Sequence, residues 1–229
     1  MSGATVTTRP YNGSMTVAIV GAALVNRIVG DDVALATPTT GTVASPDAGT
    51  AKPVTTSLVL TGADSANYTL TQPTTVTADI TKVALTVRAV DQQKTYDGTG
   101  FSAFTSSITG FVNGETAALV TGTVTFGGAA TSAIHAGAWT ITPVTSDLSA
   151  TNYTFTPQNG TLTIDQAPTI TTVAFEAGPY VYRGTPFTAT AEVTGAGTVT
   201  GTPTLTYGGD CTNVTTTGGC TVTATYAGD

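Results

Sequence analysis

The sequence predicts an all-β protein made of tandem modules, and three observations support this prediction. The chain has 229 residues, of which only 9% are charged and roughly a quarter are threonine. Threonine is β-branched and suits a pleated strand, and its hydroxyl keeps the solvent-facing side of the strand hydrated without adding charge. Glycine (26) and proline (11) are frequent, as expected for many turns between short strands. The third observation is an internal repeat.

Two unrelated motifs recur at one offset. A Tyr-Asx-Gly motif occurs twice, 85 positions apart (96 − 11), and an Asn-Tyr-Thr motif occurs twice at the same spacing (152 − 67). A Tyr-Arg-Gly sequence follows close to the next expected position. A shared offset indicates duplication of a whole module. The motif residues are Tyr11, Gly13, Asn67, Tyr68, Tyr96, Asp97, Gly98, Asn152, Tyr153, Tyr182 and Gly184.

The repeat places three modules along the chain, at residues 1–82, 83–166 and 167–229. The third module contains no Asn-Tyr-Thr, so we expect it to be incomplete at its C-terminus and the chain to be a piece of a longer protein. Almost no linker separates the first two modules, and Pro168 restricts the second connection. Short connections favour a stiff, elongated array.

Strand patterns fill each module. Runs such as Thr161–Ile164 alternate apolar residues with threonine, which is typical of strands with one buried face. Asn159-Gly160 lies between two such runs and predicts a hairpin turn. Further turns are expected at Asp97-Gly98, Gly127-Gly128 and Gly208-Gly209.

One segment carries a helical signal. Asn113 is suited to an N-cap, and good helix formers follow it to Val120, so we expect at most one short helix per module. Small Ig-like β-sandwiches and β-grasp-like modules both fit the strand pattern. Residues 113–120 are the segment that distinguishes them.

The only two cysteines, Cys211 and Cys220, lie nine positions apart in a Thr/Gly-rich stretch. We predict a disulfide between them, which a chain-entropy estimate values at roughly 2–3 kcal/mol. Zinc is not expected, because no further cysteine or histidine lies nearby to complete a tetrahedral site.

Charge and hydropathy exclude several classes of partner. The formal net charge is −7 with seven Lys+Arg, so the basic footprint of a nucleic-acid binder or of an anionic-membrane binder is missing. The most apolar stretch, Met15–Val25, is shorter than a membrane helix. The repeat pattern predicts that it is a strand rather than the core of a signal peptide. We expect no membrane insertion.

No catalytic constellation is expected. His135 is the only histidine, so a metal site built from two or more histidines cannot form within one chain. Asp31, Asp32 and Asp64 lie in turn-like contexts where solvated carboxylates are the rule. A structural calcium ion between modules is an alternative, since Ca²⁺ takes several oxygen ligands, but no dense Asp-x-Asp-x-Asp loop occurs. We therefore predict no cofactor and no enzyme.

The motif residues are interpreted structurally. Each Tyr-Asx-Gly is expected to be a packed tyrosine beside a tight turn, and in each Asn-Tyr the asparagine is expected to bond its local backbone while the tyrosine closes the core. Trp139 alternates in phase with Ile141, which favours a core position over a sugar-stacking platform. Trp139 is nevertheless the one speculative ligand contact.

These signatures resemble the YDG and MBG-type modules that are repeated in large bacterial surface proteins, including haemagglutinin-like adhesins. The first module resembles them through Tyr11-Asn-Gly13 and Asn67-Tyr-Thr69, and the second through Lys94-Thr-Tyr-Asp-Gly98 and Gly110-Phe-Val-Asn-Gly-Glu115. The third module resembles an Ig-like repeat, as in Leu205-Thr-Tyr-Gly-Gly209. The resemblance covers nearly the whole chain.

The resemblance implies an extracellular location, on the bacterial surface or secreted, and a non-enzymatic stalk or spacer role. The expected partners are neighbouring repeats of a longer chain. Two alternatives remain open: a recognition module for a host glycan or surface protein, and a filament subunit in which the third module accepts a strand by exchange. A hydrolase accessory domain is the least supported.

Overall fold

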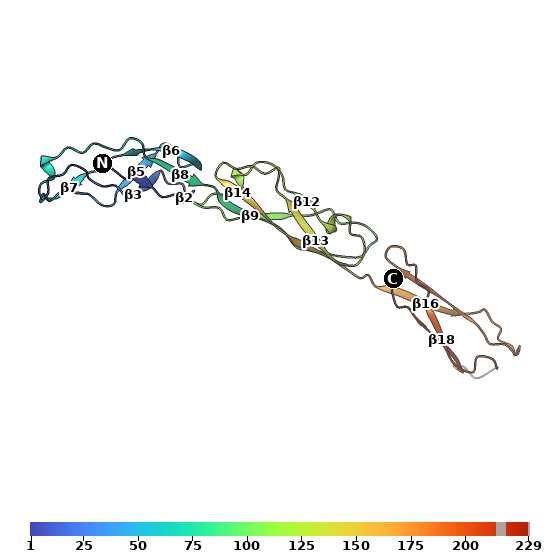
Figure 1. Ribbon diagram of the computed structural model, residues 1–229. Helices are drawn as coiled ribbons and strands as arrows, with labels where there is room; N and C mark the ends of the chain where they lie inside the picture. The colour runs from blue at the N-terminus through green and yellow to red at the C-terminus, as the bar shows by residue number, and fades with distance from the viewer. Residues whose placement is uncertain (214–218, 229) are drawn as a thin grey trace. The chain divides into compact units, whose positions relative to one another are not determined.

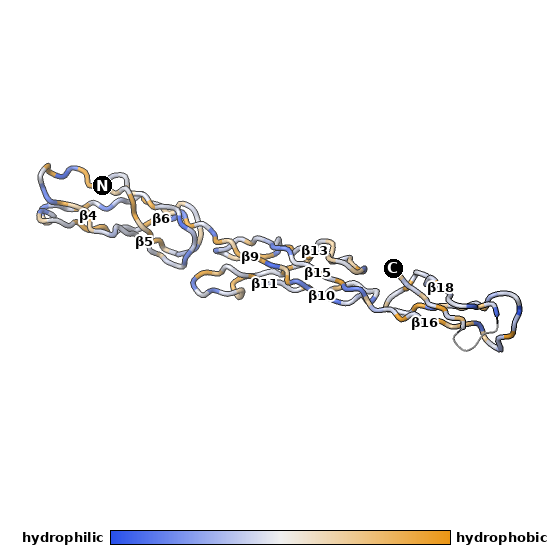
Figure 2. Tube along the Cα trace, turned by 90° about the horizontal axis from the view of Figure 1, so that it is seen from below, coloured by the Kyte–Doolittle hydropathy of each residue, from blue (hydrophilic) through white to orange (hydrophobic). Residues whose placement is uncertain are grey.

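The computed structural model describes residues 1–213 and 219–228. Within this range the regular elements are short strands and three single-turn 3-10 helices, which confirms the all-β tandem prediction (Figure 1). Apolar stretches are short and are distributed along the whole chain (Figure 2). None of the helices in the described residues has the length and apolar character needed to cross a membrane.

Contacts divide the chain into two compact units, and the second module contributes to both. The first unit consists of Met1–Ala89, Thr105–Phe126 and Thr142–Asn159, and the second of Val90–Phe104, Gly127–Ile141 and Gly160–Asp229.

The first module is a six-stranded sheet in the order β1-β3-β5-β6-β8-β2, with β4 and β7 paired separately. Its second strand runs parallel to its last one, with Arg9 opposite Ile80 and Pro10 opposite Thr81. The elements are β1 (Thr5–Val6), β2 (Arg9–Pro10), β3 (Thr16–Val20), β4 (Ala34–Leu35), β5 (Thr40–Val43), β6 (Gly49–Thr56), β7 (Leu60–Thr61), η1 (Ser65–Asn67) and β8 (Thr77–Thr81).

The second module contains two sheets, β11-β9-β14 and β10-β15-β13-β12. Its first segment, β9 followed by β10, runs parallel to its last segment, β14 followed by β15, and Val83 opposite Tyr153 and Gln92 opposite Leu162 share one register. The elements are β9 (Val83–Ala89), β10 (Gln92–Thr95), β11 (Ser106–Thr109), η2 (Ala117–Leu119), β12 (Thr125–Gly127), η3 (Ala129–Ser132), β13 (Gly137–Val144), β14 (Tyr153–Gln158) and β15 (Gly160–Asp165).

The hairpin predicted at Asn159-Gly160 is wrong. β14 pairs with β9, whereas β15 pairs with β10 and β13, so the two alternating runs lie in different sheets. Asn159 alone separates β14 from β15, and Gly160 is buried. The local Asn-Gly signal is overridden because both runs pair with the same earlier segment.

The helix predicted from Asn113 is shorter than expected and starts elsewhere. Asn113 adopts φ +56°, and Thr116 is the N-cap of η2, with its side chain accepting a hydrogen bond from Ala118 N at 3.4 Å. Residues 113–120 therefore supply one 3-10 turn. This removes from the described second module the α-helix that the β-grasp alternative requires.

The third module, in the described residues, consists of two antiparallel strand pairs, β16 with β17 and β18 with β19. Cys211 and Cys220 form a disulfide between the end of β18 and the start of β19. The elements are β16 (Thr169–Phe175), β17 (Ala189–Gly195), β18 (Thr204–Gly209) and β19 (Cys220–Thr225).

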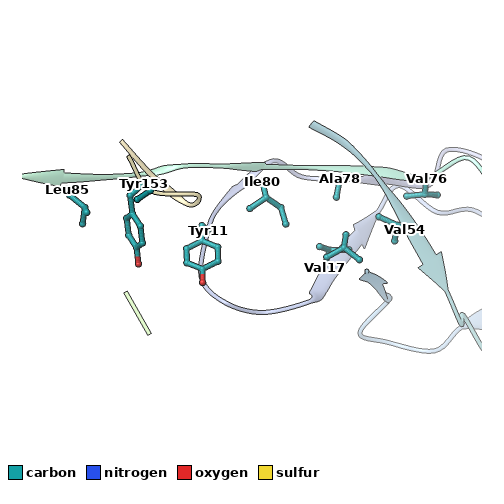
Figure 3. Packing of buried hydrophobic residues seen from close by; sticks show 10 residues of the cluster. Tyr11, Val17, Val54, Val76, Ala78, Ile80, Leu85 and Tyr153 are labelled. Atoms are coloured by element: carbon teal, nitrogen blue, oxygen red, sulfur yellow. The ribbon is translucent and has the colours of Figure 1, made fainter. Parts of the chain in front are cut away.

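One apolar cluster continues from the first module into the second. Val17, Val54 and Ile80 of the first module belong to the same buried cluster as Leu85 and Tyr153 of the second (Figure 3). Only Lys82 separates β8 from β9, so successive buried side chains of the two strands line one core.

We expect Leu85→Ala to lower the free energy of unfolding of the shared core by about 2–5 kcal/mol, because the side chain is fully buried and leaves a cavity. Leu119→Ala makes the same substitution at a side chain that is 52% exposed, and it should cost less than about 0.5 kcal/mol. Guanidinium denaturation followed by circular dichroism measures both. Equal losses would contradict a shared core centred on Leu85.

Candidate functional site: the joint between the first two modules

The site that the motif residues build lies where the first module meets the second, inside the first compact unit. We call it the joint and define it by Tyr11, Asp47, Glu115, Asn152 and Tyr153. The first two residues come from the first module and the other three from the second.

The Tyr-Asx-Gly turn of the first module positions Tyr11. The backbone N–H of Tyr11 donates to Thr81 O at 2.9 Å, which continues the β2–β8 pairing. Asn12 Oδ1 accepts from Ser14 N at 3.1 Å, a local side-chain turn that explains the Asx of the motif. Gly13 has φ +73°, and a Cβ there would lie 2.6 Å from Asn113 Nδ2, so the turn lies against the second module.

Glu115 accepts hydrogen bonds from two tyrosines of different modules. Tyr11 Oη donates to Oε1 at 2.6 Å, and Tyr153 Oη donates to Oε2. Tyr153 Oη also accepts from Val112 N at 3.2 Å. Hydrogen bonds to an ionised carboxylate are about twice as strong as neutral ones, so this carboxylate is the strongest polar link of the joint.

The two tyrosine rings are part of the shared core. Both are buried, and they meet edge to face with centroids 5.9 Å apart. Phe111 also packs edge to face against Tyr153, with ring centroids 5.4 Å apart. Figure 3 shows Tyr11 and Tyr153 side by side between Ile80 and Leu85, with both hydroxyls pointing away from the β8–β9 strand.

A second polar contact lies at Asn152. Its Oδ1 accepts from Ala48 N at 2.9 Å, and its Nδ2 donates to Asp47 Oδ1 at 3.0 Å. We expected Asn152 to bond its local backbone, and this expectation is wrong, because the side chain reaches the first module instead. Hydrogen bonds from Ser45 and then from Asn152 lower the pKa of Asp47.

The electrostatics of the joint favour neutral tyrosines. The hydrogen bond to Glu115 and then burial raise the pKa of Tyr11. Burial, and then the hydrogen bond to Glu115, raise the pKa of Tyr153. In both cases ionisation would place a phenolate beside a carboxylate.

Half of this arrangement recurs in the first module. Tyr68 Oη donates to Asp31 Oδ2 at 2.7 Å and accepts from Ile28 N at 3.0 Å. These contacts match those of Tyr153 with Glu115 and Val112, at offsets of 84 or 85 positions. The hydrogen bond to Asp31 is the main cause that raises the pKa of Tyr68.

The Tyr-Asx-Gly turn also recurs, in the second module. Asp97 Oδ1 accepts from Thr99 N at 2.9 Å and from Lys94 Nζ at 2.6 Å, and these bonds, Lys94 first, lower its pKa to about 2. A Cβ at Gly197 of the third module would lie 2.7 Å from Tyr96 Oη. Both turns therefore contact the module that follows them.

The remaining predicted residues lie outside the joint. Asn67 ends the short helix η1, and the Tyr182-Arg183-Gly184 loop is exposed. Trp139 is half-buried on β13, in phase with the buried Ile141, and its Nε1 donates to His135 O at 3.0 Å. No group of three or more metal-ligating side chains occurs in the described residues.

Sequence reasoning missed Glu115, Asp47 and Asn113. A signal for Glu115 existed: an acidic residue precedes each Asn-Tyr by a similar distance, Asp31 in the first module and Glu115 in the second. The contacts of Asp47 and Asn113 had no such repeat, because they depend on which loops face each other.

Comparison with known families agrees with the repeat. Residues 1–76 match the family described as YDG domain, and residues 85–163 match the family described as MBG domain (YGX type). These matches confirm the resemblance of the first two modules, and the joint connects the two domains. The curated proteins and the solved structures gave no match.

We expect Tyr11→Phe to destabilise the joint by about 1.5–3 kcal/mol, because it removes a hydrogen bond to a charged acceptor. Tyr182→Phe is the matched control in dilute solution, since that ring is exposed. Combining Tyr11→Phe with Glu115→Gln in a double-mutant cycle of urea unfolding should give a coupling energy of about 0.5–3 kcal/mol. Strict additivity would show that the two side chains do not interact.

The joint should also weaken in alkali. The folded pKa values of Tyr11 and Tyr153 lie above the ordinary value of 10.0, so the stability that they contribute is fully present below pH 10 and is lost as pH rises through the raised pKa values. Urea unfolding across this range, with tyrosinate absorbance alongside, measures the loss. The Tyr11→Phe/Tyr153→Phe variant should show a shallower decline, and an unchanged slope would count against this assignment.

Proposed function

Because the chain carries a YDG domain followed by an MBG domain, we propose that it is a non-enzymatic, extracellular stalk or spacer segment of a bacterial adhesin-like surface protein. Its partners in this role are neighbouring repeats of a longer chain. The joint is the observation that carries the proposal. A spacer must transmit orientation from one module to the next, and a joint that shares a core and a carboxylate does so better than a flexible linker.

The pairing of the terminal strands supports a load-bearing role. In the second module, residues 83–88 pair in parallel with 153–158, and residues 92–95 pair with 162–165 in the same register. Asp91 Oδ1 accepts from Thr161 N at 2.8 Å where the two sheets meet. Tension applied along the chain pulls these parallel segments past each other, so many hydrogen bonds resist together.

The same geometry gives a test by single-molecule force spectroscopy. Handles at Lys82 and Gln166 load the parallel segments in shear, whereas handles at Lys82 and Asn152 open the same bonds one after another from one end. We expect a clearly higher rupture force for the first geometry. The two variants share one sequence apart from the attachment points, so the second serves as the matched control. Equal forces would overturn the load-bearing role.

A further inference from the structure

Three Asn-Gly pairs occur in the chain, at residues 12–13, 113–114 and 159–160. This dipeptide can react with itself, because glycine has no side chain to shield its amide nitrogen from the carboxamide that precedes it. From the surroundings of the three pairs we propose that Asn113 is a deamidation site, and that its conversion to aspartate or isoaspartate weakens the joint.

The reaction needs only water. The backbone nitrogen of Gly114 attacks Cγ of Asn113, which closes a succinimide ring, and the Cγ–Nδ2 bond breaks. Nδ2 leaves as ammonia and takes the proton that Gly114 N loses. Water then cleaves one of the two C–N bonds of the ring. Cleavage at Cγ leaves aspartate, whereas cleavage at the backbone carbonyl leaves isoaspartate.

The pair at Asn159 is held by sheets on both sides. Gln158 lies opposite Arg88 in the pairing of β14 with β9, and Gly160 lies opposite Ile141 in the pairing of β15 with β13. Gly160 is also buried. The backbone would have to leave these sheets before the ring could close, so this pair reacts slowly in the folded chain.

The carboxamide of Asn12 is held within its own turn. Its Oδ1 accepts hydrogen bonds from Arg9 Nη1 and from Ser14 N, the latter at 3.1 Å. Arg9 Nη2 also donates to Ser14 O, which fixes the turn around the pair. Rotation of the carboxamide toward Gly13 N breaks both bonds to Oδ1, so this pair is restrained as well.

The pair at Asn113 lies in an open turn. Asn113 and Gly114 are both exposed, and a Cβ at Gly114 would find nothing within 4 Å. Their φ angles are +56° and +72°, and Glu115 N donates to Val112 O at 3.0 Å to close the turn. A left-handed φ is unfavourable for a residue with a Cβ, so Asn113 loses little when it rotates into the geometry that closes the ring.

The product would stand at the joint. A Cβ at Gly13 would lie 2.6 Å from Asn113 Nδ2, so the carboxamide lies against the turn that presents Tyr11. Deamidation replaces it with a carboxylate two residues before Glu115, and like charges on one short turn repel each other. Isoaspartate also adds a methylene to the backbone, which displaces Glu115 relative to Tyr11. The joint of an aged chain therefore opens more readily than that of a fresh one.

Peptide mapping by mass spectrometry follows the three reactions side by side in the full chain. During incubation in warm, mildly alkaline buffer we expect Asn113 to convert several-fold faster than Asn12 and Asn159. Concentrated urea removes the fold, and there the three rates should become similar. The assignment is overturned if either of the other asparagines converts as fast as Asn113 in the folded chain, or if the lead of Asn113 persists unchanged in urea.

The effect on the joint is measured with a variant that carries the charge of the product. Asn113→Asp should lower the midpoint of urea unfolding of the first compact unit more than Asn159→Asp, which adds the same charge at an exposed side chain outside the joint. Adding Glu115→Gln to each variant should shrink the difference, because the repulsion loses one partner. Equal midpoints of the two single variants, or a difference that Glu115→Gln leaves unchanged, would overturn the effect.

Ageing gives the last comparison. Asn113→Gln retains a carboxamide at this position, but its longer side chain closes the larger ring far more slowly. We expect incubation to lower the urea midpoint of the parent chain and to leave that of Asn113→Gln nearly unchanged. An equal fall in both chains would show that the joint weakens through other residues.

Discussion

The carboxylate of Glu115 holds together two tyrosines that belong to different modules, and the joint depends on it. Tyr11 approaches from the end of β2 and Tyr153 from the start of β14, and each hydroxyl donates to a different oxygen. A buried phenol without a partner is costly, so each ring stays in the core only while the carboxylate is in place. Apolar packing and hydrogen bonding therefore depend on each other across the module boundary.

Duplication explains how one chain produces such joints. Each of the first two modules has a Tyr-Asx-Gly turn that contacts the following module, and an acid with an Asn-Tyr tyrosine on a surface of the kind that receives such a turn. A module that carries both complementary surfaces docks with its own duplicate, and no additional interface has to arise.

The sequence was sufficient for the features that repetition and alternation encode. The 85-residue offset located the two motifs, and threonine-rich alternation located strands such as β15. Prediction from the sequence failed at Asn159-Gly160. An Asn-Gly pair favours a turn locally, whereas the strands that pair with β14 and β15 lie 70 positions earlier in the chain. It also failed at Asn113, where a positive φ against Gly13 replaces helix capping.

Only part of the joint could be predicted from the sequence, for the same reason. Its tyrosines belong to motifs that recur, so their burial was expected from the sequence. Glu115 was visible only as the end of a motif and as an acid that recurs before Asn-Tyr, and its role arises when a loop of the second module meets a turn of the first. Asn152 was assigned to its local backbone because that is the commonest use of an asparagine beside a turn. The contact between Asp47 and Asn152 leaves no repeated trace in the sequence.

The two kinds of contact differ in how they would respond to tension in the proposed role. Within the second module, the parallel segments share a long ladder of backbone hydrogen bonds that is loaded in shear. The joint is held by a few side-chain bonds at Glu115 and Asn152 and by packing around Tyr11. The few side-chain bonds of the joint break at a lower force than the backbone ladder, so a joint would open while its modules stay folded. The covalent connection through Lys82 then keeps the opened modules adjacent, and the joint can form again when the tension falls.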